Sequence, residues 1–370
     1  MIETAEAKKT TTKVEEGVTT QMMTFNHEEV LFCNDNATGL KAIIAIHNTV
    51  LGPGLGGCRI WKYTKEEEAF NDVMRLSRGM TYKASVAGLN LGGAKAVIIG
   101  DAKTMKTEAL MRRFGRFIDD LGGKYITAED VNSNSRDMEY IRMETRHVTG
   151  LPKHMGGSGD PSPVTAYGVW LGMKAAANEK WGSDSLSGKK VAVQGIGNVG
   201  ESLVKHLTEE GAKVYISDIN QDKLKEVANN YKAEVVDADK MFDLDIDIYA
   251  PCALGATLNT ENINRLKCSV IAGAANNQLA EEKIHGEMLL KKGVLYAPDF
   301  VINAGGLINV YSELSGNYNR EYAISKADTI YQITKEIFHI SATEKIPTYL
   351  AANRLAERRI EAIGKMKLNH

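Results

Sequence analysis

The sequence contains little cysteine, little proline and no long apolar run. Its four cysteines, spread over 370 residues, are too few and too scattered for a disulfide framework or a CxxC metal site. No stretch reaches the roughly 18 consecutive apolar residues of a membrane-spanning helix, and the polar segment from Met1 to Gln21 lacks the apolar core of a secretory signal. We therefore expect a cytoplasmic chain with no metal site and no membrane partner.

An excess of charge of one sign is also absent. Lys plus Arg number 45 and Asp plus Glu number 47, a net charge of -2, so nothing in the charge favours a nucleic-acid partner. At roughly 100–200 residues per domain, the chain length predicts two domains. Glycine, in contrast, is plentiful: 34 residues, gathered in clusters, against 7 prolines.

The order of the predicted elements divides the chain. Residues 1–20 are polar and are interpreted as a mobile tail. Residues 21–149 mix strands and helices and predict a separate first domain. Strands and helices then alternate strictly over residues 150–346, the pattern of a doubly wound, Rossmann-type parallel sheet. The predicted fold class is α/β with two domains and a cleft between them, and a last helix within residues 347–370 should pack back on the first domain.

These expectations rest on particular segments. Before residue 150 the expected strands are 42–50, 97–99 and 125–127, the expected helices are 66–80 and 104–121, and the glycine runs 52–57 and 88–93 are expected to interrupt them. After residue 150 the expected strands are 189–194, 213–217, 234–236, 246–249, 269–272 and 294–297, and the expected helices are 163–180, 199–210, 221–231, 320–342 and 348–365.

A glycine-rich turn in the second half is typical of a dinucleotide-binding site. An apolar strand that ends at Gln194 leads into G-x-G-x-x-G and then into an amphipathic helix. Such glycines allow a tight turn and close approach of the backbone to a pyrophosphate, which the helix N-terminus stabilises. The predicted pyrophosphate contacts are Gly195, Ile196, Gly197, Asn198, Val199, Gly200 and Glu201. A turn selected only for packing is the alternative.

The next predicted strand ends in an acidic residue, Asp218. A carboxylate at this place can hold the ribose 2′-hydroxyl and would repel a 2′-phosphate, so the sequence predicts NAD rather than NADP. Because this fingerprint begins in the middle of the chain, the preceding domain should supply the substrate site.

Two lysines and one aspartate are candidate catalytic residues. Lys95 lies between an expected glycine turn and an apolar strand. Burial, together with a neighbouring cation such as Lys83, would lower the pKa of Lys95 toward that of a base. Asp130 ends a predicted strand, where a cleft residue belongs. The alternatives are that both lysines are solvated and that Asp130 is a helix N-cap.

Short runs in a fixed order carry a resemblance to a known family. They are Gly52-Pro-Gly-Leu-Gly-Gly57, Gly79-Met-Thr-Tyr-Lys83, Gly88-Leu-Asn-Leu-Gly-Gly-Ala-Lys95, Thr127-Ala-Glu-Asp130, Ser162-Pro-Val-Thr-Ala-Tyr-Gly168, Ala250-Pro-Cys-Ala-Leu-Gly255, Ala272-Gly-Ala-Ala-Asn-Asn277 and Ile302-Asn-Ala-Gly-Gly306. With them, the chain resembles the Glu/Leu/Phe/Val amino-acid dehydrogenases, most closely the members that act on branched-chain amino acids. The resemblance implies NAD-dependent, reversible oxidative deamination of leucine, valine and isoleucine to 2-oxo acids and ammonia by a homo-oligomer, an octamer.

The resemblance also implies a role for each matching residue. Lys83 matches the lysine that holds the substrate α-carboxylate, Lys95 the catalytic lysine, and Asp130 its partner in proton transfer. Gly56 and Gly57 match a glycine pair whose backbone lies against the substrate.

The remaining matches concern the side-chain pocket and the cofactor. The pocket positions are Leu55, Ala128, Leu307 and Val310, and the positions near the nicotinamide are Thr165 and Asn277. Glutamate-specific members have a lysine in place of Leu55. Without that lysine a glutamate side chain would be left unpaired, so we expect glutamate to be rejected.

Two alternative functions remain open, and the sequence departs from the usual pattern of the family at two places. The alternatives are a member of the same family that acts on phenylalanine, and a non-catalytic NAD-binding regulatory protein. Ala94 stands where a third glycine is usual, which would cost on the order of 1 kcal/mol if its φ were positive. The segment 132–137 is also unlike that of many members.

Overall fold

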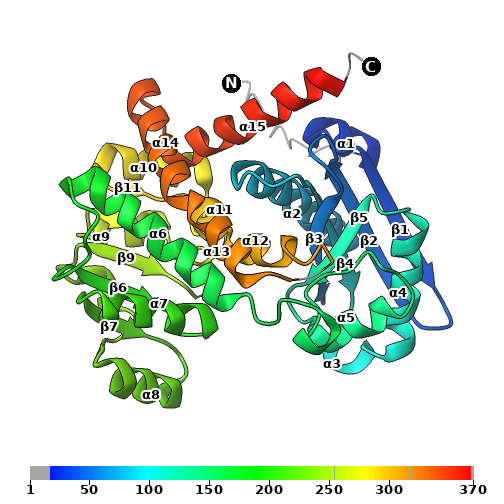
Figure 1. Ribbon diagram of the computed structural model, residues 1–370, viewed down its shortest axis with the longest axis horizontal. Coiled ribbons are helices and arrows are strands. Elements are labelled where there is room, and N and C mark those ends of the chain that lie inside the picture. Colours follow the sequence, from blue (N-terminus) through cyan, green and yellow to red (C-terminus); the bar gives the residue numbers. More distant parts are fainter. Residues whose placement is uncertain (1–16, 254, 317, 368–370) are drawn as a thin grey trace, which may run out of the picture.

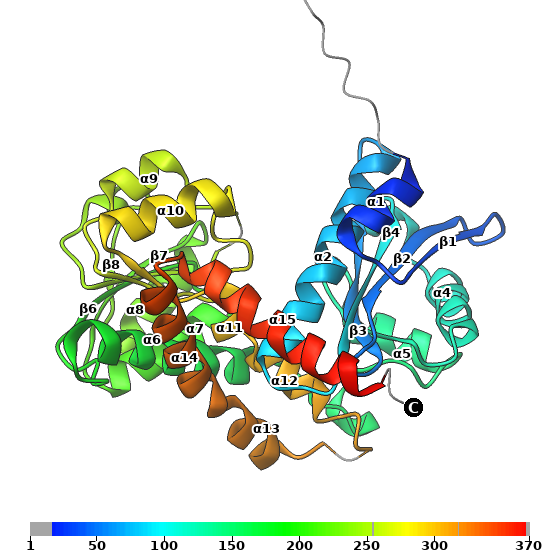
Figure 2. The same ribbon diagram turned by 90° about the horizontal axis from the view of Figure 1, so that it is seen from above.

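The chain folds into two lobes, each built on its own β-sheet (Figures 1 and 2). The computed structural model describes residues 17–253, 255–316 and 318–367. The first sheet has strand order β1-β2-β4-β3-β5, and the second has order β11-β10-β9-β6-β7-β8. The predicted two-part α/β architecture is confirmed, while residue 150 as the boundary between the domains remains our proposal.

The first lobe is a mixed sheet with helices on both faces. Its elements are α1 (Val18–Phe25), β1 (Glu29–Asp35), β2 (Leu40–Asn48), β3 (Gly54–Trp61), α2 (Glu66–Val86), β4 (Gly92–Ile99), α3 (Ala102–Met105), α4 (Glu108–Asp120), β5 (Tyr125–Glu129) and α5 (Ser135–Arg142). β4 pairs antiparallel with β2 and parallel with β3, and β3 pairs parallel with β5. Alternation along β2 sends Ile43 toward α2 and Ile44 toward α4.

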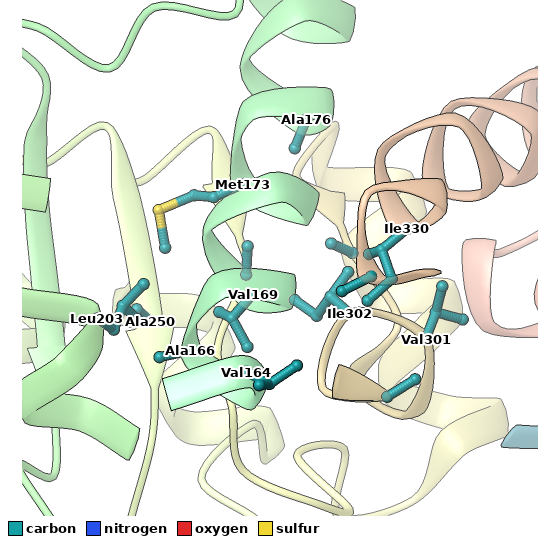
Figure 3. Close-up of a cluster of buried hydrophobic side chains, with 14 of the residues drawn as sticks. Val164, Ala166, Val169, Met173, Ala176, Leu203, Ala250, Val301, Ile302 and Ile330 are labelled. Atoms are coloured by element: carbon teal, nitrogen blue, oxygen red, sulfur yellow. The ribbon is translucent and has the colours of Figure 1, made fainter. Parts of the chain in front are cut away.

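The second lobe is an all-parallel sheet covered by helices, as the strict alternation predicts. Its elements are η1 (Lys153–Met155), α6 (Ser162–Trp181), β6 (Lys190–Gln194), α7 (Asn198–Glu209), β7 (Lys213–Ser217), α8 (Gln221–Tyr231), β8 (Glu234–Val235), η2 (Lys240–Asp243), β9 (Ile248–Pro251), α9 (Thr260–Arg265), β10 (Val270–Ile271), α10 (Glu282–Lys292), β11 (Leu295–Tyr296), α11 (Asp299–Ile302), α12 (Gly305–Tyr311), α13 (Arg320–Ala327), α14 (Thr329–Glu344) and α15 (Thr348–Lys367). Figure 3 shows that α6 is buried on two sides: Ile302 and Ile330 lie on one side of the helix, and Met173 points to the other side.

The glycine runs 52–57 and 88–93 each begin in a turn, as expected, with a positive φ at Gly52 and Gly88, but each ends in a strand. Gly54 begins β3 and Gly92 begins β4. A Cβ on Gly56 would lie 1.8 Å from the carbonyl oxygen of Ala94, and one on Gly93 would lie 2.1 Å from the amide nitrogen of Thr81 on α2. These glycines therefore permit close backbone packing and do not form a turn. Ala94 lies inside β4 and has no positive φ, so the expected strain is absent.

The two ends of the chain differ from the expectations in detail. Residues 1–16 of the predicted tail lie outside the described residues, and from Val18 onward the chain is helix α1 rather than tail. The last helix, α15, packs on α2: Ser85 Oγ donates to the carbonyl of Ala356 at 2.8 Å, and Arg359 Nη1 donates to that of Leu89 at 2.7 Å. Among the described residues, no helix is both long and apolar enough to cross a membrane.

Candidate active site

A cavity of about 310 Å³ lies between the two lobes and collects residues from both. The residues singled out in the sequence that line it are Leu55, Gly57, Lys83, Lys95, Ala128, Asp130, Asn277, Leu307 and Val310. Gly56 lies behind Leu55 and Gly57, against β4. Thr165 adjoins the cavity, because a Cβ on the lining residue Gly306 would lie 2.8 Å from its hydroxyl.

Lys95 and Asp130 form an ion pair in this cavity. Lys95 Nζ lies 3.1 Å from Asp130 Oδ2, and Lys95 is only 6% exposed. The same carboxylate oxygen accepts a hydrogen bond from Arg59 Nε at 3.0 Å. Burial alone would raise the pKa of Asp130, but Lys95 and Arg59 outweigh that effect and lower it. The solvated alternative is therefore wrong for Lys95.

The position of Asp130 follows from the sheet. β3 lies between β4 and β5, so Lys95, Arg59 and Asp130 come from three neighbouring parallel segments. The N-cap of α5 is Asn134, so the N-cap alternative for Asp130 is wrong. The amide nitrogen of Asp130 donates to Ser133 Oγ at 2.8 Å. The unusual segment 132–137 thus supports the catalytic candidate directly.

Arg59 was not predicted from the sequence. Besides Asp130 it contacts Asp72, with Nη1 2.8 Å from Oδ2, and Tyr63 Oη donates to that same oxygen at 2.7 Å. An arginine inside the otherwise buried strand β3 is a local signal that could have pointed to it, because buried charges require partners.

Lys83 lies in the last turn of α2 and faces the cavity. Burial lowers its pKa to about 8, helped by the charge of Lys95 and opposed by Asp299 and Asp130. Lys95 is buried, as predicted, but it has a carboxylate partner. Among the residues that the structure describes, Lys83 has no carboxylate within ion-pair distance, which leaves it available to an anionic ligand.

Asp299, at the start of α11, is a further carboxylate that lines the cavity beside Asp130 and Glu129, and it was not predicted from the sequence. Its Oδ2 accepts from the amide of Gln278 at 3.0 Å and its Oδ1 from that of Phe300 at 2.6 Å. Burial raises its pKa. Its position just after the expected strand 294–297, at the carboxyl edge of a parallel sheet, could have identified it as a site residue.

The other wall of the cavity is apolar. Leu55 and Ala128 come from the first lobe, and Leu307 and Val310 come from α12 of the second. Met80 and Phe300, which were not predicted, complete this wall. The site thus combines a charged end with an apolar end, an arrangement suited to a zwitterion with a hydrocarbon side chain.

The predicted dinucleotide loop has the required shape. Gly195 has φ +95, and a Cβ on Gly200 would lie 2.0 Å from the Gly195 carbonyl oxygen, so the turn is closely packed. Gly197, the N-cap of α7, has open space where a Cβ would lie. No side chain caps α7, so the amides of its first turn are available to a phosphate. The loop therefore fits a pyrophosphate.

Two acidic residues flank this loop. Asp218 Oδ2 accepts from the Ile196 amide at 2.8 Å, and its Oδ1 accepts from the Asn220 amide at the same distance. The carboxylate is thereby held at the end of β7 beside the glycine turn. Glu201 pairs with Lys223 of α8 at 2.6 Å, which compensates its charge at the helix N-terminus.

Comparisons with known proteins agree with this geometry. Residues 24–147 match Glu/Leu/Phe/Val dehydrogenase, dimerisation domain, and residues 156–220 and 215–366 match Glutamate/Leucine/Phenylalanine/Valine dehydrogenase. The leucine dehydrogenase of Thermoactinomyces intermedius is 56% identical over 346 residues, 94% of each chain. The L-tryptophan dehydrogenase of Nostoc punctiforme is 50% identical over 341 residues, 92% of this chain and 95% of that one.

A solved structure shows the same fold. The crystal structure of L-tryptophan dehydrogenase from Nostoc punctiforme superposes with a TM-score of 0.84 at 48% identity, covering 93% of this chain and 99% of that one. Both the sequence matches and this structure span both lobes and the cavity between them. The chain belongs to the Glu/Leu/Phe/Val dehydrogenase family and is an amino-acid dehydrogenase.

Proposed function

We propose that this enzyme catalyses the NAD-dependent, reversible oxidative deamination of branched-chain L-amino acids to 2-oxo acids and ammonia. The observation that carries the proposal is the Lys95–Asp130 pair, which lies beside the unpaired Lys83 in a cavity whose other end is apolar.

The charged end binds the amino acid. Lys83 has no carboxylate within ion-pair distance in the described part of the chain, and it can fix the substrate α-carboxylate as a point charge. Leu55, Ala128, Leu307 and Val310 then receive the hydrocarbon side chain. Fixing both ends orients the Cα–H bond, which is the main contribution of the protein to hydride transfer. NAD, when bound, supplies the hydride acceptor.

Lys95 and Asp130 carry the protons. Once the substrate α-ammonium has released a proton to solvent and Lys95 has passed its own proton to Asp130, loss of hydride from Cα leaves an iminium carbon. Water then adds to this carbon as the amine of Lys95 accepts one of the water protons. The carbinolamine then loses ammonia as Asp130 moves the hydroxyl proton to the leaving nitrogen. Arg59 keeps Asp130 ionised between turnovers, consistent with the lowered pKa of that carboxyl. The net reaction consumes the zwitterionic amino acid, the oxidised cofactor and one water, and yields the 2-oxo acid, ammonium, the reduced cofactor and one proton.

We infer the choice of amino acid from Leu55 and the choice of cofactor from Asp218. A glutamate side chain would meet the apolar Leu55 at the position where glutamate-specific members of the family have a lysine. Asp218 supports the preference for NAD, because its carboxylate would repel a 2′-phosphate.

A substrate panel tests the proposal. NADH absorbance should appear with leucine, valine and isoleucine plus NAD, and be much weaker with glutamate or NADP. Phenylalanine and tryptophan belong in the panel because a close relative is a tryptophan dehydrogenase. A higher kcat/KM for either aromatic substrate than for leucine would contradict the proposed substrate class.

The non-catalytic alternative is excluded by membership of the dehydrogenase family. Retained turnover in Lys95→Ala would contradict the mechanism. An octameric assembly is proposed from the family resemblance and is tested by light scattering. A cytoplasmic location also remains a prediction, in keeping with the four free cysteines.

A further inference from the structure

Glu313 makes an unusual set of hydrogen bonds just outside the cavity. Its Oε2 accepts from Thr149 Oγ1 at 2.9 Å and from the Gly150 amide at 3.0 Å. Its Oε1 accepts from the Ser158 amide at 2.9 Å and from the Ser158 hydroxyl. Thr149 and Ser158 are almost fully buried. One carboxylate therefore satisfies four donors, all from the segment 149–158 that passes from one lobe to the other.

The segment 149–158 begins beside strand β5, which carries Ala128 on one wall of the side-chain pocket. The Thr149 amide donates to the Thr127 carbonyl at 2.9 Å, and Val148 forms a β-bridge with Thr127. Thr127 precedes Ala128 on β5, so movement of residue 149 is transmitted directly to the Ala128 wall. Gly150 itself lines the cavity.

The backbone of Glu313 belongs to the opposite wall. Its amide donates to the Val310 carbonyl at 3.1 Å, which places it on the turn that ends α12. Val310 and Leu307 of that helix line the cavity, and α12 lies between the lobes (Figures 1 and 2). Thr149 Oγ1 also lies 3.1 Å from the Val310 carbonyl. The two walls thus meet at Glu313.

We propose that Glu313 is a positioning residue that ties the Ala128 wall to the Leu307 and Val310 wall and thereby determines which amino-acid side chains fit the pocket. The inference rests on the proposed amino-acid pocket. A carboxylate only accepts hydrogen bonds, so it matches four donors, whereas glutamine would direct an NH2 group at one pair of them. That mismatch leaves buried donors unpaired and allows the walls to separate.

The test compares side-chain selectivity in Glu313→Gln and Thr149→Val. Glu344→Gln is the matched control, because Glu344 on α14 also accepts from more than one group, Arg354 and Arg358, but lies outside the cavity lining. The readout is the ratio of kcat/KM for leucine to that for phenylalanine. If the wild type prefers other substrates, the ratio is formed from its two best substrates of different size, so failure of the leucine assignment does not affect this test.

We expect this ratio to change at least about tenfold in Glu313→Gln and several-fold in Thr149→Val. A tenfold change is typical of a small change in the shape of a hydrophobic pocket. KM for the smaller substrate should rise more than kcat falls, and Glu344→Gln should leave the ratio unchanged. An unchanged ratio in Thr149→Val and Glu313→Gln, or an equal loss for all substrates, would overturn the proposal. Thr149→Val, which keeps its volume, supplies the answer if Glu313→Gln does not fold.

Discussion

Replacing Asp130 by asparagine separates proton transfer from binding. The change removes the charge partner of Lys95 while the apolar wall and Lys83 stay intact. We expect kcat to fall by about 10²–10⁴-fold, the usual contribution of a positioned acid or base, which is about 3–5 kcal/mol of transition-state stabilisation. The stability loss should be smaller, about 1–3 kcal/mol, because Arg59 keeps Asp72 at 2.8 Å and only Lys95 is left unpaired.

The assay follows NADH formation with leucine, with thermal unfolding measured in parallel. Asp72→Asn is the matched control: it removes the other carboxylate of Arg59 and leaves the Lys95–Asp130 pair in place. The control should lose stability and keep kcat within about tenfold of the wild type. If Asp72→Asn lost as much turnover as Asp130→Asn, the effect would come from the Arg59 network and our assignment of proton transfer to Asp130 would be refuted.

Three further changes test the charge and the shape of the site. Leu55→Lys should lower kcat/KM for leucine by more than about 100-fold, because it places an ammonium against the hydrocarbon side chain; retained leucine activity would place the side chain elsewhere. In the free enzyme, Lys83 loses its charge as the pH rises through its pKa of about 8. The kcat/KM for the 2-oxo acid should therefore fall above that pH, and Lys83→Gln should have a low kcat/KM without this inflection. Asp218→Asn should narrow the preference for NAD over NADP by about tenfold or more in steady-state kinetics, because it removes the negative charge; an unchanged preference would show that other groups select the cofactor.

Local sequence was a good guide to the strands of the second lobe and a poorer one to its helices. Helices α9 to α12 were not expected, and the single helix expected over 320–342 is divided into α13 and α14. β7 and α8 occur at the expected residues, because each combines its own periodicity with clear turns. The glycines within 54–57 and at 92–93 were expected to interrupt strands, but they lie in strands, where tertiary packing requires them. Gly93 lets α2 pack closely against β4, and no local sequence pattern predicts its contact with Thr81.

The same limit explains the site residues that were missed. Lys83, Lys95 and Asp130 were found because short runs around them resemble a known family. Arg59 contacts Asp130 across 71 positions of sequence, and only the order β4-β3-β5 brings the two together. Asp299 likewise enters the site because its lobe faces Lys83.

The chain connects the lobes at more than one place. Residues 149–158 pass from the first lobe to the second, and α15 returns to rest on α2 through Ser85 and Arg359 (Figure 2). A body attached at two separate points swings most readily about the line that joins them, so we expect the lobes to open mainly by rotation about that line. The same rotation would then admit the amino acid and release its oxo acid.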